Sequence, residues 1–221
     1  PKDNPLSSGK VEIKYMTAKE EDILTNSSFI RKGTVLDKLL ESVIISKINI
    51  DDLIVGDKNA LLIATRILGY GSQYEVEING EKETIDLSQL ENKEFDESQI
   101  TQGLNEFQFT LPHTNTPITY KILTGSDEKK LEKEIEGIKR IKKDSNPSLS
   151  TRLKYIITSV NGDTERKAIN EFVDVYLLAK DSKALRDHIK ETQPDVDLNV
   201  ILDSGSEVRV PIGLGFFWPD A

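Results

Sequence analysis

Three separate β-hairpins constrain the fold of this chain more than any other feature of its sequence. Each is a pair of short segments in which apolar and polar residues alternate, and the pairs cover residues 73–87, 104–123 and 198–212. Asn79-Gly80 and Ser204-Gly205 supply turn residues that tolerate positive φ. No strand–helix–strand crossover pattern joins these segments. The sequence therefore predicts an α+β fold with isolated antiparallel hairpins and no parallel sheet.

Between the hairpins, apolar residues recur at helical spacing, so we expect helix pairs that alternate with the hairpins. Thr17 and Glu20 match a capping box before the first helix. Residues 11–17 alternate like a half-buried strand, and the run ALLIATRIL after a break at Gly56 predicts a helix buried on nearly all sides. Further helices are expected near residues 34–44, 126–143, 146–162, 163–180 and 182–191, the fourth with Ile169, Phe172, Val175 and Tyr176 on one side.

The composition changes near residue 124, after an acidic and turn-rich connector. We therefore expect two lobes. An N-terminal α+β lobe would cover residues 11–123, and a C-terminal helical lobe would cover residues 124–221 and carry the last hairpin and an aromatic tail. Residues 1–10 contain two Pro, two Ser and a Gly, so we expect them to form a flexible arm.

The composition is that of an ordinary globular protein, with 37% hydrophobic and 30% charged residues. A net charge of -9 argues against a nucleic-acid partner. The absence of cysteine excludes disulfides, thiolate catalysis and Cys-based zinc sites. Because no segment has the apolar length of a signal peptide or a membrane span, we expect no membrane partner and a cytoplasmic location until the protein joins a complex.

Two apolar surfaces are candidate partner-binding sites. The tail gathers the only Trp and two of the seven Phe, as Phe216, Phe217 and Trp218. It can plug its own core or dock into a neighbouring subunit, because aromatic side chains bury large rigid areas. The helix expected at 126–143 has a narrow apolar seam that suits one neighbour or partner. The seam consists of Leu131, Ile135, Ile138 and Ile141.

Patterns that carry chemistry are scarce. His113 and His188 have no second histidine at a metal-ligand spacing, and no nucleophile elbow, phosphate loop or zinc-protease pattern is present. The acidic pair Asp51-Asp52, or the cluster Glu94, Asp96 and Glu97, could be read as the acid–base pair of a hydrolase. Acidic residues are so frequent here that such clusters arise by chance. We therefore predict no enzyme activity, no catalytic, cofactor or metal residues, and no small-molecule substrate.

Three stretches together resemble the baseplate hub proteins of T4-like contractile-tailed phages, the T4 bacteriophage base plate protein family. They are MTAKEEDILTNSSFIRKGTVLDKLLESVI, IVGDKNALLIATRILGYGSQYEVEI and VDLNVILDSGSEVRVPIGLGFFWPDA, and they imply coverage of almost the whole chain. Members of the family often have a cysteine knuckle in the hairpin turns. The matching turns here, residues 78–82 and 202–207, have none, so this chain resembles a cysteine-free member.

The resemblance implies a structural, non-enzymatic protein of the phage tail baseplate. Its partners would be other hub or tail subunits or a second copy of itself, and it would assemble in the host cytoplasm. A second hypothesis is a transient assembly chaperone of the hub that is absent from the mature virion. A hydrolase with an acidic pair and a general binding module remain as alternatives.

Overall fold

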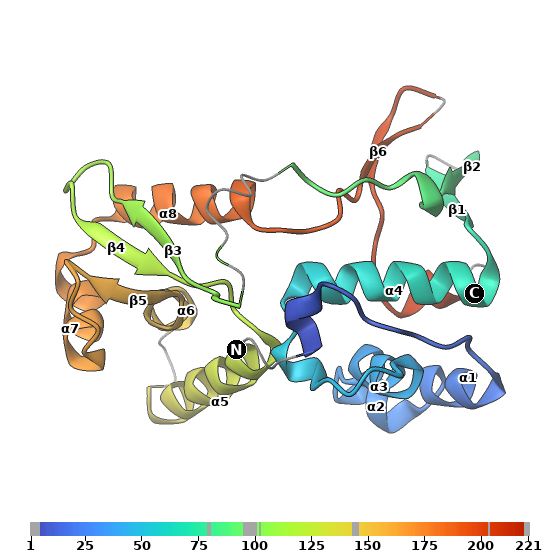
Figure 1. Cartoon of the computed structure of the whole chain (residues 1–221), viewed down its shortest axis with the longest axis horizontal. Coiled ribbons are helices and arrows are strands. Elements are labelled where there is room, and N and C mark those ends of the chain that lie inside the picture. The colour runs from blue at the N-terminus through green and yellow to red at the C-terminus, as the bar shows by residue number, and fades with distance from the viewer. Residues whose placement is uncertain are drawn as a thin grey trace. The chain divides into compact units, whose positions relative to one another are not determined.

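The computed structural model describes residues 5–78, 81–94, 101, 103–142, 146–202 and 204–218. The chain forms two compact units. Unit 1 comprises residues 1–7, 51–54 and 94–193, and unit 2 comprises residues 8–50, 55–93 and 194–221. Both units combine helices with small antiparallel sheets (Figure 1), which confirms the predicted α+β class.

This division differs from the boundary that we predicted at residue 124. The hairpin within 104–123 belongs to unit 1 with the helices that follow it, whereas the last hairpin and the aromatic tail belong to unit 2. Val210, Phe216 and Phe217 lie in one apolar cluster with residues of the N-terminal helices. A composition change along the chain does not reveal this pairing, because it brings together segments that are far apart in sequence.

Residues 94–193 are inserted between two parts of unit 2. The segment that leaves unit 2 pairs with the segment that returns to it: Asn92 forms an antiparallel bridge with Val196. The N–H of Lys93 donates to the carbonyl of Asp195 at 2.9 Å, and the N–H of Asp197 donates to that of Glu91 at 2.8 Å. The point of insertion is therefore a short two-stranded neck within unit 2.

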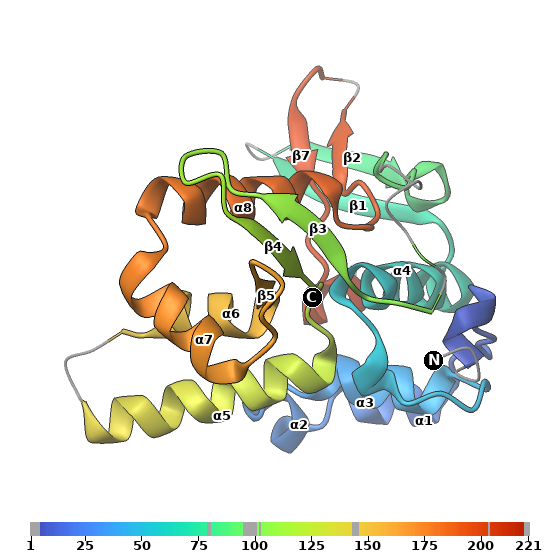
Figure 2. The same ribbon diagram turned by 60° about the vertical axis from the view of Figure 1, so that its left-hand side comes forward.

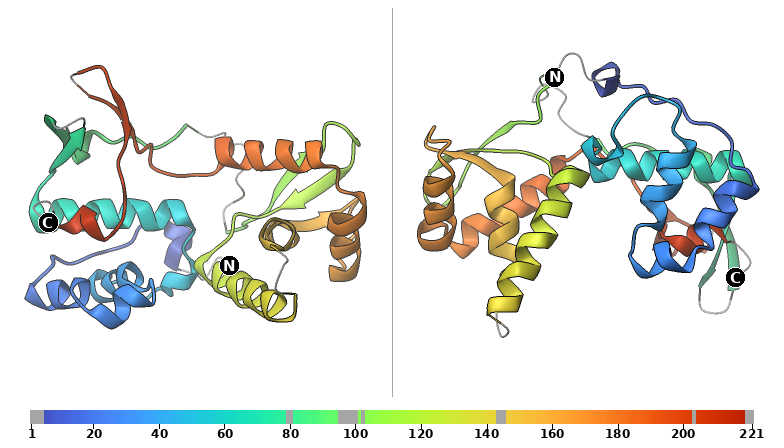
Figure 3. Two further views of the ribbon diagram at one scale, coloured as in Figure 1. Left: turned by 180° about the vertical axis from the view of Figure 1, so that it is seen from behind. Right: turned by 90° about the horizontal axis from the view of Figure 1, so that it is seen from below.

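Unit 2 is built from helices and two hairpins whose apolar faces meet in one core. Figure 3 shows the C-terminal segment, in red, lying beside the long helix of this unit. The elements are α1 (Ala18–Leu24), α2 (Ser27–Arg31), α3 (Val35–Val43), α4 (Val55–Tyr70), β1 (Gln73–Ile78), β2 (Glu81–Asp86), β6 (Asn199–Ile201) and β7 (Glu207–Arg209), with 3-10 turns η3 (Leu87–Gln89) and η6 (Leu214–Phe217).

Both hairpins of unit 2 are confirmed. β1 pairs antiparallel with β2, from Gln73 opposite Asp86 onward, and β6 pairs antiparallel with β7. Gly205 has φ of +82°, as the predicted turn requires. The turn predicted at Asn79-Gly80 lies outside the described residues.

The capping box that begins α1 is confirmed and is extended by further donors. The carboxylate of Glu20 is 0% exposed and accepts from the N–H of Thr17 at 2.8 Å. Lys14 Nζ donates to it at 2.9 Å and Ser42 Oγ at 2.6 Å. Burial alone raises the pKa of Glu20, but the hydrogen bonds from Ser42, Thr17 and Lys14 outweigh burial and hold that pKa well below its ordinary value.

The structure differs from the sequence prediction at residues 11–17. Residues 11–17 form no strand: Ile13 makes one isolated bridge, with Ile44, because the neighbouring segment is short and follows directly on the end of α3. Pro5–Ser8, within the predicted flexible arm, form a 3-10 turn (η1), while residues 1–4 lie outside the described part. A further short turn, η2 (Ile50–Asp52), precedes α4 as expected.

Helix α4 does not break at Gly56, and it is not buried on all sides. It begins at Val55 and includes Gly56, whose backbone lies so close to the returning chain that a Cβ there would sit 2.1 Å from the carbonyl oxygen of Pro194. Glycine therefore serves a close backbone contact at this position. Val55 is 52% and Leu68 37% exposed, because the core of unit 2 covers one side of the helix only.

Unit 1 places helices around a three-stranded antiparallel sheet in the order β3-β4-β5 (Figure 2). The hairpin predicted within 104–123 is confirmed as β3 and β4. The elements of unit 1 are β3 (Phe107–Thr110), β4 (Pro117–Tyr120), α5 (Gly125–Ile141), α6 (Ser148–Ile156), β5 (Ile157–Val160), α7 (Arg166–Glu171), the π-helical turn η5 (Phe172–Tyr176) and α8 (Ala179–Thr192).

The third strand was not predicted. The helix expected over 146–162 ends at Ile156, and the next four residues, Ile-Thr-Ser-Val, pair with β4. Three of these four are β-branched, and such residues favour strands when a partner strand is present. The partner lies more than thirty positions earlier in the chain, so the local pattern alone did not reveal it.

Helix α8 holds the turn between β3 and β4. Asp181, in the first turn of α8, is 0% exposed. Its carboxylate accepts from the N–H of His113 at 2.8 Å and from that of Thr114 at 3.2 Å. The predicted turn PHTNTP is thus fixed by two charge-assisted hydrogen bonds.

Candidate functional site

The aromatic C-terminal segment packs inside unit 2. Phe216 is 1% and Phe217 0% exposed, and the ring centroid of Phe216 lies 5.2 Å from that of Tyr74. Trp218 is partly buried against the same core. Of the two alternatives for the tail, docking within its own chain is the one found. Phe216 and Phe217 are core residues and are not exposed to a partner.

A buried guanidinium ties this segment to α4. Arg66 is 1% exposed, and its Nε donates to the carbonyl of Phe216 at 3.0 Å. Nη1 donates to the carbonyl of Gly71 at 2.9 Å and Nη2 to that of Gln73 at 3.4 Å. Burial lowers the pKa of Arg66. Sequence reasoning missed this residue because it counted Arg66 as part of an apolar run.

The seam of α5 is largely covered by unit 1 itself. Leu131 is 0% exposed, and Ile135 packs partly buried against the same core. Ile138 is half-buried, and Ile141, at the end of the helix, is 84% exposed. Leu131 is therefore a core residue and cannot contact a partner in this conformation.

Polar contacts to α6 hold α5 in place. Arg152 donates two hydrogen bonds to the carboxylate of Glu128, at 2.5 and 2.8 Å, and the hydroxyl of Tyr155 donates to Glu134 at 2.9 Å. This arrangement covers the seam from the side of α6, so the expectation of a partner along the whole seam does not hold for Leu131.

The structure reveals an exposed apolar segment that the sequence did not indicate. Val175 is 67%, Tyr176 58% and Leu178 51% exposed. We call these three residues the 175–178 surface. Leu177, between them, packs against the core of unit 1 and anchors the backbone. Three large apolar side chains within four residues, all more than half exposed, form an uncommon feature on a protein surface.

The π-helical turn explains why the prediction for Val175 and Tyr176 is wrong. The N–H of Leu177 donates to the carbonyl of Phe172, five residues earlier, at 2.8 Å. In a regular α-helix Tyr176 would share the inner side with Ile169 and Phe172. The wider turn rotates the chain, so that Leu177 faces inward and Tyr176 outward.

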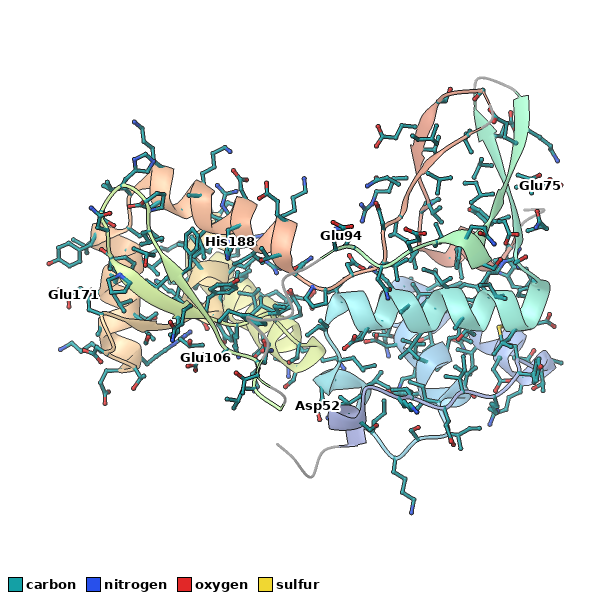
Figure 4. The ribbon with its side chains drawn as sticks, turned by 45° about the horizontal axis from the view of Figure 1, so that its top comes forward. Asp52, Glu75, Glu94, Glu106, Glu171 and His188 are labelled. Atoms are coloured by element: carbon teal, nitrogen blue, oxygen red, sulfur yellow. The ribbon has the colours of Figure 1, made fainter. Side chains whose placement is uncertain are left out.

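The labelled carboxylates of unit 1 form no acid–base pair. Figure 4 shows Asp52, Glu94, Glu106 and Glu171 on separate segments of the chain, with no two directed at a common point. Asp51 is ion-paired with Lys129 at 2.6 Å. Asp96 and Glu97 lie outside the described residues. The hydrolase hypothesis therefore gains no support from the part of the chain that the structure describes.

His188 lies in an aromatic environment on α8 (Figure 4), where its ring stacks on Phe109 with centroids 4.4 Å apart and meets Tyr120 edge-on at 5.8 Å. Burial lowers the pKa of His188, with a smaller opposing effect from Glu191. Its Nε2 has no hydrogen-bond partner among the described residues. No three His, Asp or Glu side chains in the described ranges could hold a metal ion together.

A hollow on the sheet of unit 1 is lined by both polar and apolar residues. The hydroxyl groups of Thr110, Thr119 and Ser159 contribute to its wall, beside Phe109 and Ile118. The hydroxyl of Thr119 lies 2.6 Å from that of Thr158 and 2.7 Å from that of Ser159. These hydroxyls satisfy one another, and within the described residues no histidine or carboxylate is hydrogen-bonded to them, so they do not form a nucleophile–base pair.

Comparison with protein-family models, with curated proteins and with solved structures finds no match for this chain. Among the residues that the structure describes, no helix combines the length and the apolar character that crossing a membrane requires.

Proposed function

We propose that this chain is a non-enzymatic structural component of the baseplate hub of a contractile-tailed phage, and that it acts through contacts with other proteins. The three stretches that resemble the baseplate family support the location. The 175–178 surface is the observation that carries the mode of action, because it exposes three large apolar side chains within four residues, and exposed apolar side chains that gather in one place mark contact sites.

The scaffold beneath this surface supports its assignment as a contact site. Phe172 and Val173 are buried directly before it, and Leu177 anchors it from within. Lys154 Nζ on α6 is ion-paired with Asp174 at 2.7 Å. A surface fixed in this way loses little conformational entropy when a partner covers it.

The partners in this proposal are other hub or tail subunits, and the site of action is the tail baseplate after assembly in the host cytoplasm. No substrate, cofactor or nucleic acid has a role in it.

Mass spectrometry of purified virions and of baseplate intermediates tests the proposal. A structural component is present in both preparations, at a constant ratio to the other hub proteins. Presence in the intermediates and absence from the virions would instead identify the chain as an assembly chaperone. Absence from both would refute a role in the baseplate.

A further inference from the structure

The outer edge of β3 carries backbone groups that the sheet leaves unpaired. β3 pairs with β4 so that Phe107, Phe109 and Leu111 face Tyr120, Ile118 and Thr116. The N–H of Leu111 donates to the carbonyl of Thr116 at 3.0 Å, which identifies these as the hydrogen-bonded pairs. In the alternation of an antiparallel ladder, the N–H and C=O groups of Gln108 and Thr110 must then point away from β4.

Both residues are exposed, and none of these four backbone groups has a partner among the described residues. At the opposite edge of the same sheet, the outward groups of Val160 are paired. There the N–H of Val160 donates to the carbonyl of Asp163, and the N–H of Asp163 donates back to the carbonyl of Val160, both at 2.9 Å. The outward groups of Gln108 and Thr110 on β3 have no such turn beside them among the described residues.

The open edge is short but carries no other usual protection. Proteins guard free strand edges with a very short strand, lysine, proline or a bulge. Phe107–Thr110 contain no charged residue and no proline, and their register with β4 is regular. The other hairpins differ: β1 and β2 carry Glu75, Glu77 and Lys82 on exposed positions, and β7 carries Glu207 and Arg209.

We propose that β3 pairs antiparallel with β3 of a second copy of this chain, about a two-fold axis that passes beside Phe109. This places Gln108 of one copy opposite Thr110 of the other, so that each outward N–H meets an outward C=O. The match is complete for both residues, and the two three-stranded sheets become one six-stranded sheet. Phe109 would face Phe109 of the second copy in a non-hydrogen-bonded pair, where side chains lie closest.

Charges around the strand permit this register. Glu106 is the only acidic residue from position 104 to position 113, and it would lie opposite Pro112 of the second copy and next to the exposed His113. No like charges are therefore opposed. Since the edge is only four residues long, the contact is small, and we expect a weak, concentration-dependent dimer.

The inference goes beyond the proposed function and does not rest on it. It is tested by amide hydrogen exchange, read residue by residue, and by sedimentation of the full-length protein over a roughly hundredfold range of concentration. The amides of Gln108 and Thr110 should exchange fast in the dilute sample. Their exchange should slow by about tenfold at the concentration at which nine-tenths of the molecules are dimeric. The amides of Phe109 and Leu111, which bond to β4, are the internal reference and should stay protected throughout.

Gln108→Pro removes one outward N–H without removing a bond to β4, since proline is tolerated on a free edge. It should abolish dimerisation, whereas Gln108→Ala should dimerise like the wild type. Retained protection of Leu111 shows that the proline variant is folded. If the Gln108→Pro variant does not fold, the Thr110→Pro variant is used in its place. A proline at position 110 suits the strand because Phe109 already has the extended backbone that a residue before proline requires.

A chain that remains monomeric at every concentration, with Gln108 and Thr110 exchanging fast, would overturn the proposal. So would a dimer that forms equally well with Gln108→Pro, or one in which no β3 amide slows, since either result places the interface elsewhere. None of these outcomes affects the role in the baseplate, which the virion preparations test separately.

Discussion

The Nε of Arg66 donates to the carbonyl oxygen of Phe216 at 3.0 Å, across 150 positions of sequence. The same guanidinium bonds to Gly71 and Gln73, at the end of α4 and the start of β1. One side chain thus joins a helix, a hairpin and the C-terminal segment of unit 2. It does so through carbonyl groups, which accept hydrogen bonds but do not neutralise its charge.

Replacing Arg66 by methionine should lower the free energy of unfolding of unit 2 by about 3 kcal/mol, because the buried carbonyls lose their donor. The control is Arg209→Met, at an exposed position of β7, which should change stability by less than about 0.5 kcal/mol. Urea unfolding followed by circular dichroism measures both. Equal effects of the two substitutions would contradict the role assigned to Arg66.

Alanine substitutions at the neighbouring residues Phe217 and Trp218 should lower the free energy of unfolding by different amounts. Phe217 is 0% exposed, so Phe217→Ala should destabilise the protein by about 3–5 kcal/mol through the cavity that it leaves. Trp218 is only partly buried, so Trp218→Ala should cost clearly less, although tryptophan is the larger side chain. Thermal unfolding of the two variants decides the order. A larger loss for Trp218→Ala would show that this residue is more deeply packed than described.

Acid should weaken unit 1 through His188. Its pKa is lowered in the folded protein, so the unfolded chain binds a proton first as the pH falls below the ordinary value of 6.5. The stability that the neutral ring provides is therefore present above pH 6.5 and is lost as the pH falls through the folded pKa. Unfolding curves at several pH values should show this loss, and His188→Phe should remove it. His113→Gln, at an exposed turn position, is the control and should behave like the wild type.

Unit 2 should respond to acid at lower pH, through Glu20. Its folded pKa lies below the ordinary value of 4.5, so the stability it provides is present above pH 4.5 and is lost as the pH falls further. Glu20→Gln should destabilise unit 2 at neutral pH and flatten the dependence below pH 4.5. A wild-type melting temperature that does not change between pH 5 and pH 3 would contradict this account.

The sequence predicted those features that depend on neighbouring residues. The capping box at Thr17 and Glu20, the turn at Ser204-Gly205 and the three hairpins were all read correctly, because each depends on a few adjacent side chains. Features that depend on distant partners were missed. β5 needs β4 to be a strand, Gly56 needs the returning segment at Pro194, and the buried state of Phe217 needs the core of unit 2.

For a related reason, the sequence did not show which apolar side chains the chain itself covers. Apolar side chains at helical spacing indicate a buried face, but not whether the same chain covers it, and for Leu131 the chain does. The 175–178 surface was not predicted, because we expected a regular helix over residues 163–180. One wide turn at Phe172 moves Tyr176 from the inner to the outer side, and no residue in FVDVYLL indicates such a turn by its type.

In the proposed function, the chain acts by presenting the 175–178 surface to other subunits of the baseplate. Tyr176→Ser probes this contact, with Tyr15→Ser as the matched control, since Tyr15 is 67% exposed but lies in unit 2. Baseplates assembled with each variant are separated by gradient sedimentation, and the bound chain is quantified. We expect Tyr176→Ser to lower incorporation at least tenfold, as the loss of a contact worth about 1.4 kcal/mol or more would. Tyr15→Ser should be incorporated normally. Equal incorporation of both variants would contradict the claim.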